Sequence, residues 1–129
     1  MKILVVEDDQ KTRDEIVNDL IDKGYDVMHA ENGLEALKLI SNHRFDLLIT
    51  DLNMPYLDGY GLAEATGGIP PMFIYTSGSS LGGIDEVLKR KGTQFSTFLV
   101  RATPEKILDL VMKMLTVSVE KNTKVANSI

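Results

Sequence analysis

Acidic residues directly follow two apolar runs in this chain and could do chemistry together. The acidic triplet 7–9 directly follows the apolar run 3–6, and Asp51 directly follows the apolar run 47–50. Apolar runs of this length are typical of strands buried on both faces of a parallel sheet. Carboxylates at the carboxyl ends of such strands lie where open α/β sheets place their chemistry.

If the two strands are neighbours, the carboxylates meet at one edge of the sheet. They then repel one another unless a cation lies among them, and hard carboxylate oxygens suit Mg²⁺. Glu7, Asp8 and Asp51 are therefore candidate residues of an acidic metal site. Asp9 has an equally good alternative role as the N-cap of the helix that follows.

Length and composition predict one compact domain. The chain has 129 residues, of which 43% are hydrophobic, so it can bury one core but has no room for two. A formal net charge of −5 argues against general affinity for nucleic acid or anionic membranes. The absence of cysteine excludes disulfides and thiolate metal sites. The apolar run before the acidic triplet is too short for a signal peptide or a membrane span, so a cytoplasmic location is expected.

Apolar runs alternate with segments of helical periodicity. We predict strands at 2–6, 25–30, 46–50, 72–76 and 97–100, separated by helices at 11–23, from Leu34 to about Ile40, at 60–66 and at 84–91, with a last helix from Pro104. This (βα)₅ alternation predicts an α/β fold, a doubly wound parallel sheet with helices on both faces. We expect residues 1–119 to form the domain and the polar residues 120–129 to form a disordered tail.

Two helices carry clear apolar faces and end signals. The first has Gly24 as its stop signal, and the last has Thr103 as its N-cap. The predicted buried faces consist of Ile16, Val17, Leu20 and Ile21 in the first helix and Ile107, Val111, Met114 and Leu115 in the last.

With these positions assigned, residues 1 to about 118 resemble a response-regulator receiver domain. The run 3–9 resembles the first strand and acidic pocket of that family, and Asp51 with the following 53–55 and 58–59 (Asn-Met-Pro and Asp-Gly) resembles its phosphoacceptor motif and turn. Thr76 matches the hydroxyl residue that contacts the phosphoryl group. Phe98 matches the aromatic switch residue.

The resemblance implies a flavodoxin-like fold with strand order 2-1-3-4-5 and a two-component signalling function. It implies that Asp51 is phosphorylated by a histidine kinase or a phosphotransfer protein, and that Mg²⁺ is held by the Asp8 and Asp51 carboxylates and the Asn53 backbone carbonyl, with Glu7 acting through water. Such a domain is a phosphoacceptor rather than a turnover enzyme, at most catalysing its own phosphoryl transfer and dephosphorylation. Signalling then proceeds through a downstream protein partner, a homodimer being possible, without direct nucleic-acid or membrane contact.

The chain departs from the family pattern where a lysine and a proline normally follow strand five. Arg101-Ala102 stands there, and the planar guanidinium of Arg101 keeps the charge but not the shape of an ammonium group. The glycine-rich helix 60–66 is also short. Both departures favour an alternative, a pseudo-receiver that binds partners without phosphorylation, whereas the acidic pocket, Asp51 and Thr76 favour the phosphoacceptor. A haloacid dehalogenase-type phosphatase would need an acid two residues after Asp51, where this chain has Asn53.

Overall fold

The structure is a computed structural model of the chain, and it describes residues 1–67, 70–76, 95–100 and 103–113. Within these ranges the strands are β1 (Lys2–Val6), β2 (Asp26–Ala30), β3 (Leu47–Asp51), β4 (Met72–Thr76) and β5 (Phe95–Val100). The helices are α1 (Gln10–Asp22), α2 (Gly33–Asn42), α3 (Gly59–Thr66) and a helical segment at 104–113.

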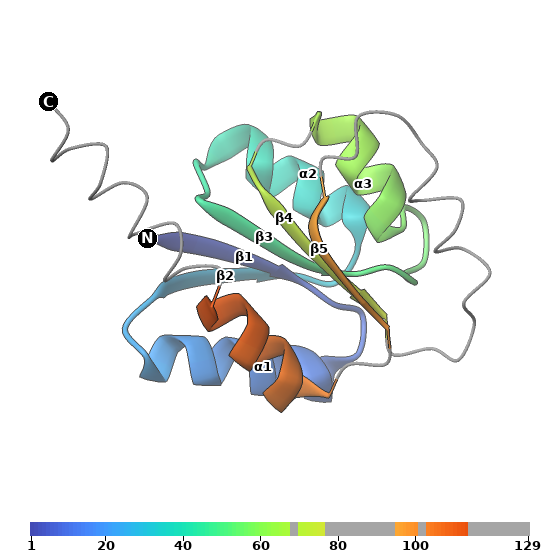
Figure 1. Ribbon diagram of the computed structural model, residues 1–129. Coiled ribbons are helices and arrows are strands. Elements are labelled where there is room, and N and C mark those ends of the chain that lie inside the picture. The colour runs from blue at the N-terminus through green and yellow to red at the C-terminus, as the bar shows by residue number, and fades with distance from the viewer. Residues whose placement is uncertain (68–69, 77–94, 101–102, 114–129) are drawn as a thin grey trace, which may run out of the picture.

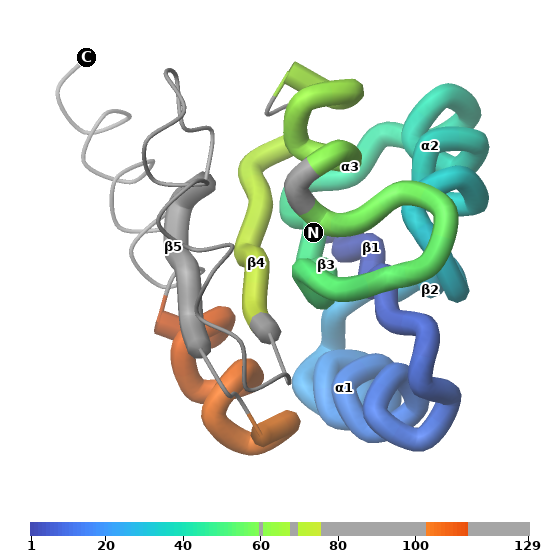
Figure 2. Tube along the Cα trace, turned by 90° about the vertical axis from the view of Figure 1, so that its right-hand side faces the viewer, coloured from blue at the N-terminus to red at the C-terminus, as the bar shows by residue number. Residues whose placement is uncertain are grey.

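All five strands form one parallel sheet in the order β2-β1-β3-β4-β5. Helix α1 and the segment 104–113 cover one face of this sheet, and helices α2 and α3 cover the other (Figures 1 and 2). The predicted flavodoxin-like fold and its strand order are therefore confirmed.

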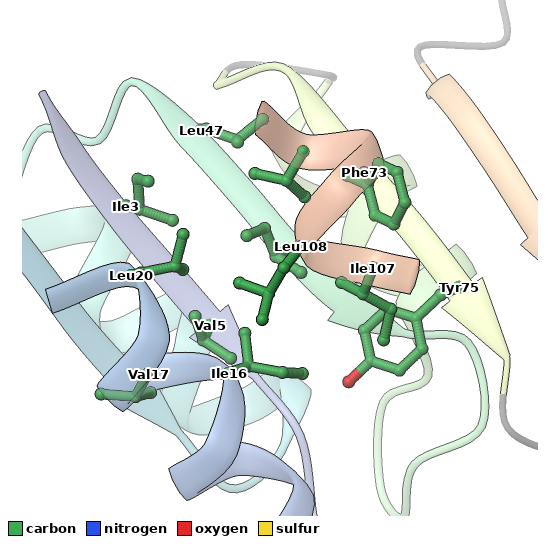
Figure 3. Close-up of a cluster of buried hydrophobic side chains, with 12 residues drawn as sticks. Ile3, Val5, Ile16, Val17, Leu20, Leu47, Phe73, Tyr75, Ile107 and Leu108 are labelled. Carbon is green, nitrogen blue, oxygen red and sulfur yellow. The ribbon is translucent and has the colours of Figure 1, made fainter. Parts of the chain in front are cut away.

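The core consists of two layers that follow from side-chain alternation along the central strands. Ile3 and Val5 of β1 point to the face covered by α1, whereas Leu4 and Val6 point to the face covered by α2 and α3. The α1 layer, part of which Figure 3 shows, contains Ile3, Val5, Ile16, Val17, Leu20, Leu47, Ile49, Phe73, Tyr75, Ile107, Leu108 and Val111. Because both faces are covered, the central strands are largely apolar, with polar residues at their ends.

Polar side chains cap the N-termini of the helices that begin at the carboxyl edge of the sheet. The Asp9 carboxylate accepts a hydrogen bond from the Thr12 backbone N–H at 2.9 Å, so Asp9 is the N-cap of α1. Thr103 accepts one from the Lys106 N–H at 3.3 Å, which confirms the predicted cap of the last helix. Among the described helices, none has the length and apolar character that crossing a bilayer requires.

Several predicted boundaries and one predicted core residue need correction. Strand β3 includes Asp51 rather than ending before it, and β5 begins at Phe95. Ile21 is 50% exposed, because the buried face of α1 consists of residues 13, 16, 17 and 20 and residue 21 is turned away from it. The predicted helix at 84–91, the residues Met114 and Leu115 and the tail at 120–129 lie outside the described residues.

Candidate metal site

The strand register places three polar side chains in one row across the carboxyl edge of the sheet. Asp51 pairs with Tyr75, and the pairing of β1 with β3 continues through Val6 and Thr50, so that Glu7 follows beside Asp51. Alternation assigns Glu7, Asp51 and Tyr75 to the sheet face that carries Val5, Ile49 and Phe73. The row therefore lies on the α1 side.

The structure brings together the three carboxylates that were predicted to meet. Oxygen atoms of Glu7, Asp8 and Asp51 all lie within 4.8 Å of one another. Glu7 is 2% exposed and Asp51 is 3% exposed, whereas Asp8 is open to solvent. Two buried carboxylates and one exposed carboxylate this close to one another form a set of oxygen ligands that fits Mg²⁺.

Glu7 is fixed at three points by donors from three parts of the chain. Its Oε2 accepts a hydrogen bond from the Asp9 backbone N–H at 3.0 Å, and its Oε1 accepts one from the Tyr75 hydroxyl at 2.7 Å. The Arg13 guanidinium donates to the Glu7 backbone carbonyl at 2.8 Å. Neither Tyr75 nor Arg13 was predicted from the sequence to belong to the site. The burial of Arg13 could have been predicted from helical spacing, because Arg13 lies one turn before Ile16 on the buried face of α1.

Asp51 is held by the loop that follows β3. Its Oδ1 accepts a hydrogen bond from the Asn53 backbone N–H at 3.2 Å. Gly59, at the start of α3, packs so closely that an added Cβ would lie 2.6 Å from the Asp51 carbonyl oxygen. Its own N–H donates to the Leu52 carbonyl at 2.9 Å. A larger residue at position 59 would have to displace backbone, so glycine is required there.

Burial raises the pKa of both buried acids. It is the largest cause of the rise for Glu7, whose pKa goes from 4.5 to about 7, although the Asp9 N–H and the Tyr75 hydroxyl oppose the rise. Burial is also the largest cause for Asp51, whose pKa rises to about 6; the Asn53 N–H opposes this rise and the Asp8 charge adds to it. In the absence of a cation, ionising this site therefore costs free energy.

These pKa values predict that the metal-free domain loses stability as the pH rises. In the folded state Glu7 and Asp51 hold protons at a pH at which the unfolded chain has released them. This tighter proton binding stabilises the folded state. The stabilisation is complete below about pH 4 and disappears as the pH rises through about 6 to 7. We expect the free energy of unfolding in EDTA to fall by roughly 1–3 kcal/mol between about pH 5 and about pH 8. Urea unfolding at several pH values measures this fall.

The control for that prediction is the double variant Glu7→Gln, Asp51→Asn, in which neither side chain titrates. Its stability should change much less over the same pH range. An equal decline in the double variant would assign the pH dependence to other groups.

The remaining predicted site residues are placed only in part. Thr76 is the last residue of β4, one position beyond the partner of Asp51, and Phe98 pairs with Ile74 along β5. These are backbone positions, and the roles of both side chains stay predictions. Arg101 lies outside the described residues.

Comparison with known proteins assigns the family. The response regulator receiver domain family matches residues 3–95, so the chain belongs to that family. It is 31% identical to the probable transcriptional regulator ycf29 of Pyropia yezoensis over 136 residues, which cover 98% of this chain and 59% of that protein. The curated relatives compared first are longer proteins, of which this chain spans 30% to 59%.

Solved receiver structures share the fold. The receiver domain of the Francisella response regulator 1452 superimposes with a TM-score of 0.75 at 28% identity, covering 93% of this chain and 98% of that one. The chemotaxis response regulator CheY4 of Vibrio cholerae superimposes with a TM-score of 0.73 at 30% identity, covering 87% of this chain and 96% of that one. This protein is thus a receiver domain of the kind found in response regulators of two-component systems.

Proposed function

We propose that this receiver domain accepts a phosphoryl group on Asp51 from a histidine kinase or a phosphotransfer protein. The observation that carries the proposal is the cluster of Glu7, Asp8 and Asp51 oxygen atoms within 4.8 Å of one another at the carboxyl ends of the central strands. Carboxylates at such a position are costly without a cation and have no use in packing.

The transfer itself needs little from the protein beyond positioning. A carboxylate oxygen of Asp51 attacks the phosphorus atom of a phosphohistidine, a P–O bond forms as the P–N bond breaks, and the imidazole leaves with the bonding electrons. The hydrogen bond from Asn53 to Oδ1 orients the carboxylate for this attack. The acyl phosphate that results is later hydrolysed by water.

Mg²⁺ would be held by the Asp8 and Asp51 carboxylates and the Asn53 backbone carbonyl. Bound there, it neutralises charge on the transferring phosphoryl oxygens. Glu7 would act through water, since both of its oxygens already accept hydrogen bonds from the protein. The exposed Asp8 leaves the site open to solvent, as a cation that keeps several waters requires.

The other residues that match the family pattern would transmit phosphorylation to a downstream protein. Thr76 would contact the phosphoryl group and, with Phe98, relay its presence to the face near β5, where a downstream protein binds. Arg101 would supply the positive charge that the family's lysine normally supplies. We further propose that the domain comprises residues 1–119, acts in the cytoplasm and signals through protein contacts, a second copy of the chain included.

Intact-mass measurement tests the proposal directly. With Mg²⁺ and acetyl phosphate, the protein should gain the mass of one phosphoryl group, and EDTA should prevent the gain. A protein that gains no phosphoryl group and does not bind beryllofluoride would instead be a pseudo-receiver, which signals without phosphate.

A further inference from the structure

Tyr75 combines complete burial with a polar group directed at the acidic site. Its side chain has no exposed surface, and its hydroxyl donates to Glu7 Oε1 at 2.7 Å. Glu7 follows β1 and Tyr75 belongs to β4, and β3 with Asp51 lies between these two strands. The Tyr75 side chain therefore crosses β3 beside Asp51 to reach Glu7.

Packing alone does not explain this hydroxyl. Phe73 lies on the same strand, faces the same core layer and is equally buried, and it has no polar atom (Figure 3). A phenylalanine at position 75 would bury nearly the same apolar surface without desolvating a hydroxyl. The hydroxyl is therefore best explained by what it does to Glu7.

The hydroxyl helps to orient the Glu7 carboxylate. Together with the Asp9 N–H on Oε2, it occupies one acceptor position on each oxygen and so fixes the rotation of the carboxylate plane. Burial and the Glu7 charge raise the pKa of Tyr75 far above its ordinary value, so the hydroxyl remains a donor whether or not the site is charged.

We propose that Tyr75 is a positioning residue of the metal site, which holds Glu7 so that its remaining acceptor positions face the water shell of the bound Mg²⁺. The inference rests on the proposed function, because it assigns Tyr75 a task in that same site. Groups that hydrogen-bond directly to metal ligands commonly change metal affinity by 10- to 100-fold. Tyr75 acts one step further out, through a residue that reaches Mg²⁺ by way of water, so its effect is expected at the lower end of that range.

The test is Mg²⁺ affinity in a double-mutant cycle. Tyr75→Phe should weaken Mg²⁺ binding about tenfold in the otherwise unchanged protein. In the Glu7→Gln background the same substitution should change affinity by less than about twofold, since the carboxylate on which the hydroxyl acts is gone. Tyr25→Phe is the matched control, because Tyr25 packs against the same core layer at the opposite end of β2 from the site. It should leave affinity unchanged.

A second signal does not depend on affinity. In protein labelled with ¹³C at the tyrosine ring, the Tyr75 resonance should shift as Mg²⁺ is added, whereas that of Tyr25 should not. Circular dichroism must show that Tyr75→Phe is folded at the temperature of the titration.

The outcomes separate the two proposals. If the wild type binds Mg²⁺ and folded Tyr75→Phe binds it equally well, Tyr75 has no positioning role and the proposed function is unaffected. An equal loss with and without Glu7→Gln would also overturn the role assigned to Tyr75, because the effect would not pass through Glu7. If the wild type itself binds no Mg²⁺ at millimolar concentration, both proposals fail.

Discussion

Asp51→Asn is expected to abolish the gain of a phosphoryl group from acetyl phosphate in the presence of Mg²⁺. An amide oxygen is a far weaker nucleophile than a carboxylate, and no other carboxylate of the cluster combines near-complete burial with an orienting bond from the loop after β3. Intact-mass spectrometry over a time course measures the effect, which should exceed a hundredfold in rate.

The chain offers a matched control in the same loop. Asp58 is exposed and caps α3 by accepting a hydrogen bond from the Gly61 N–H at 2.7 Å. Asparagine is an equally good N-cap, so Asp58→Asn makes the same chemical change without disturbing the fold. It should be phosphorylated like the wild type. A full phosphoryl gain in Asp51→Asn, mapped by peptide sequencing to another residue, would contradict the assignment.

The second large effect is expected for Asp8→Ala, which should weaken Mg²⁺ binding on the order of a hundredfold. Asp8 is the exposed member of the cluster and supplies oxygen atoms within 4.8 Å of those of Glu7 and Asp51. Its loss removes a ligand and also part of the repulsion at the site, because the Asp8 charge is one of the causes that raise the pKa of Asp51. Mg²⁺ affinity should therefore fall while the metal-free protein becomes no less stable.

That opposite response distinguishes a lost ligand from a damaged fold. Isothermal titration gives the affinity, and urea unfolding in EDTA gives the stability. Asp26→Ala, at the amino end of β2, removes the same charge far from the site and should leave Mg²⁺ affinity unchanged. If Asp8→Ala binds Mg²⁺ as the wild type does, the metal site lies elsewhere.

Local patterns in the sequence were sufficient to predict a parallel sheet, whereas the order of its strands, which makes β1 and β3 neighbours, came from the resemblance to receiver domains. Apolar runs 3–6 and 47–50 define buried strands, and parallel strands bring their carboxyl ends to one edge. The face of each side chain follows from alternation once the strand is placed. Once β1 and β3 are neighbours, these rules bring Glu7 and Asp51 into one pocket without knowledge of any particular contact.

The rest depends on tertiary geometry that a pattern does not contain. Tyr75 lies 68 residues from Glu7 in the sequence, and its hydroxyl reaches that carboxylate only because the strand order inserts β3 between β1 and β4. Within its apolar run, Tyr75 is indistinguishable from a packing residue. Arg13 has a charge that normally predicts an exposed position, yet it is buried and donates a hydrogen bond to the Glu7 carbonyl.

The strand order also has a consequence for the chain during its synthesis. β1 can pair with β2 once residue 30 has left the ribosome, but its other edge remains uncovered until residues 47–51 follow. At that open edge, residues 3–6 of β1 form an uncharged apolar run of the type that pairs with foreign strands. The addition of β3 closes this edge and, by the same movement, brings Asp51 beside Glu7. The nascent chain therefore covers this apolar edge at the same step that brings the Glu7 and Asp51 carboxylates together.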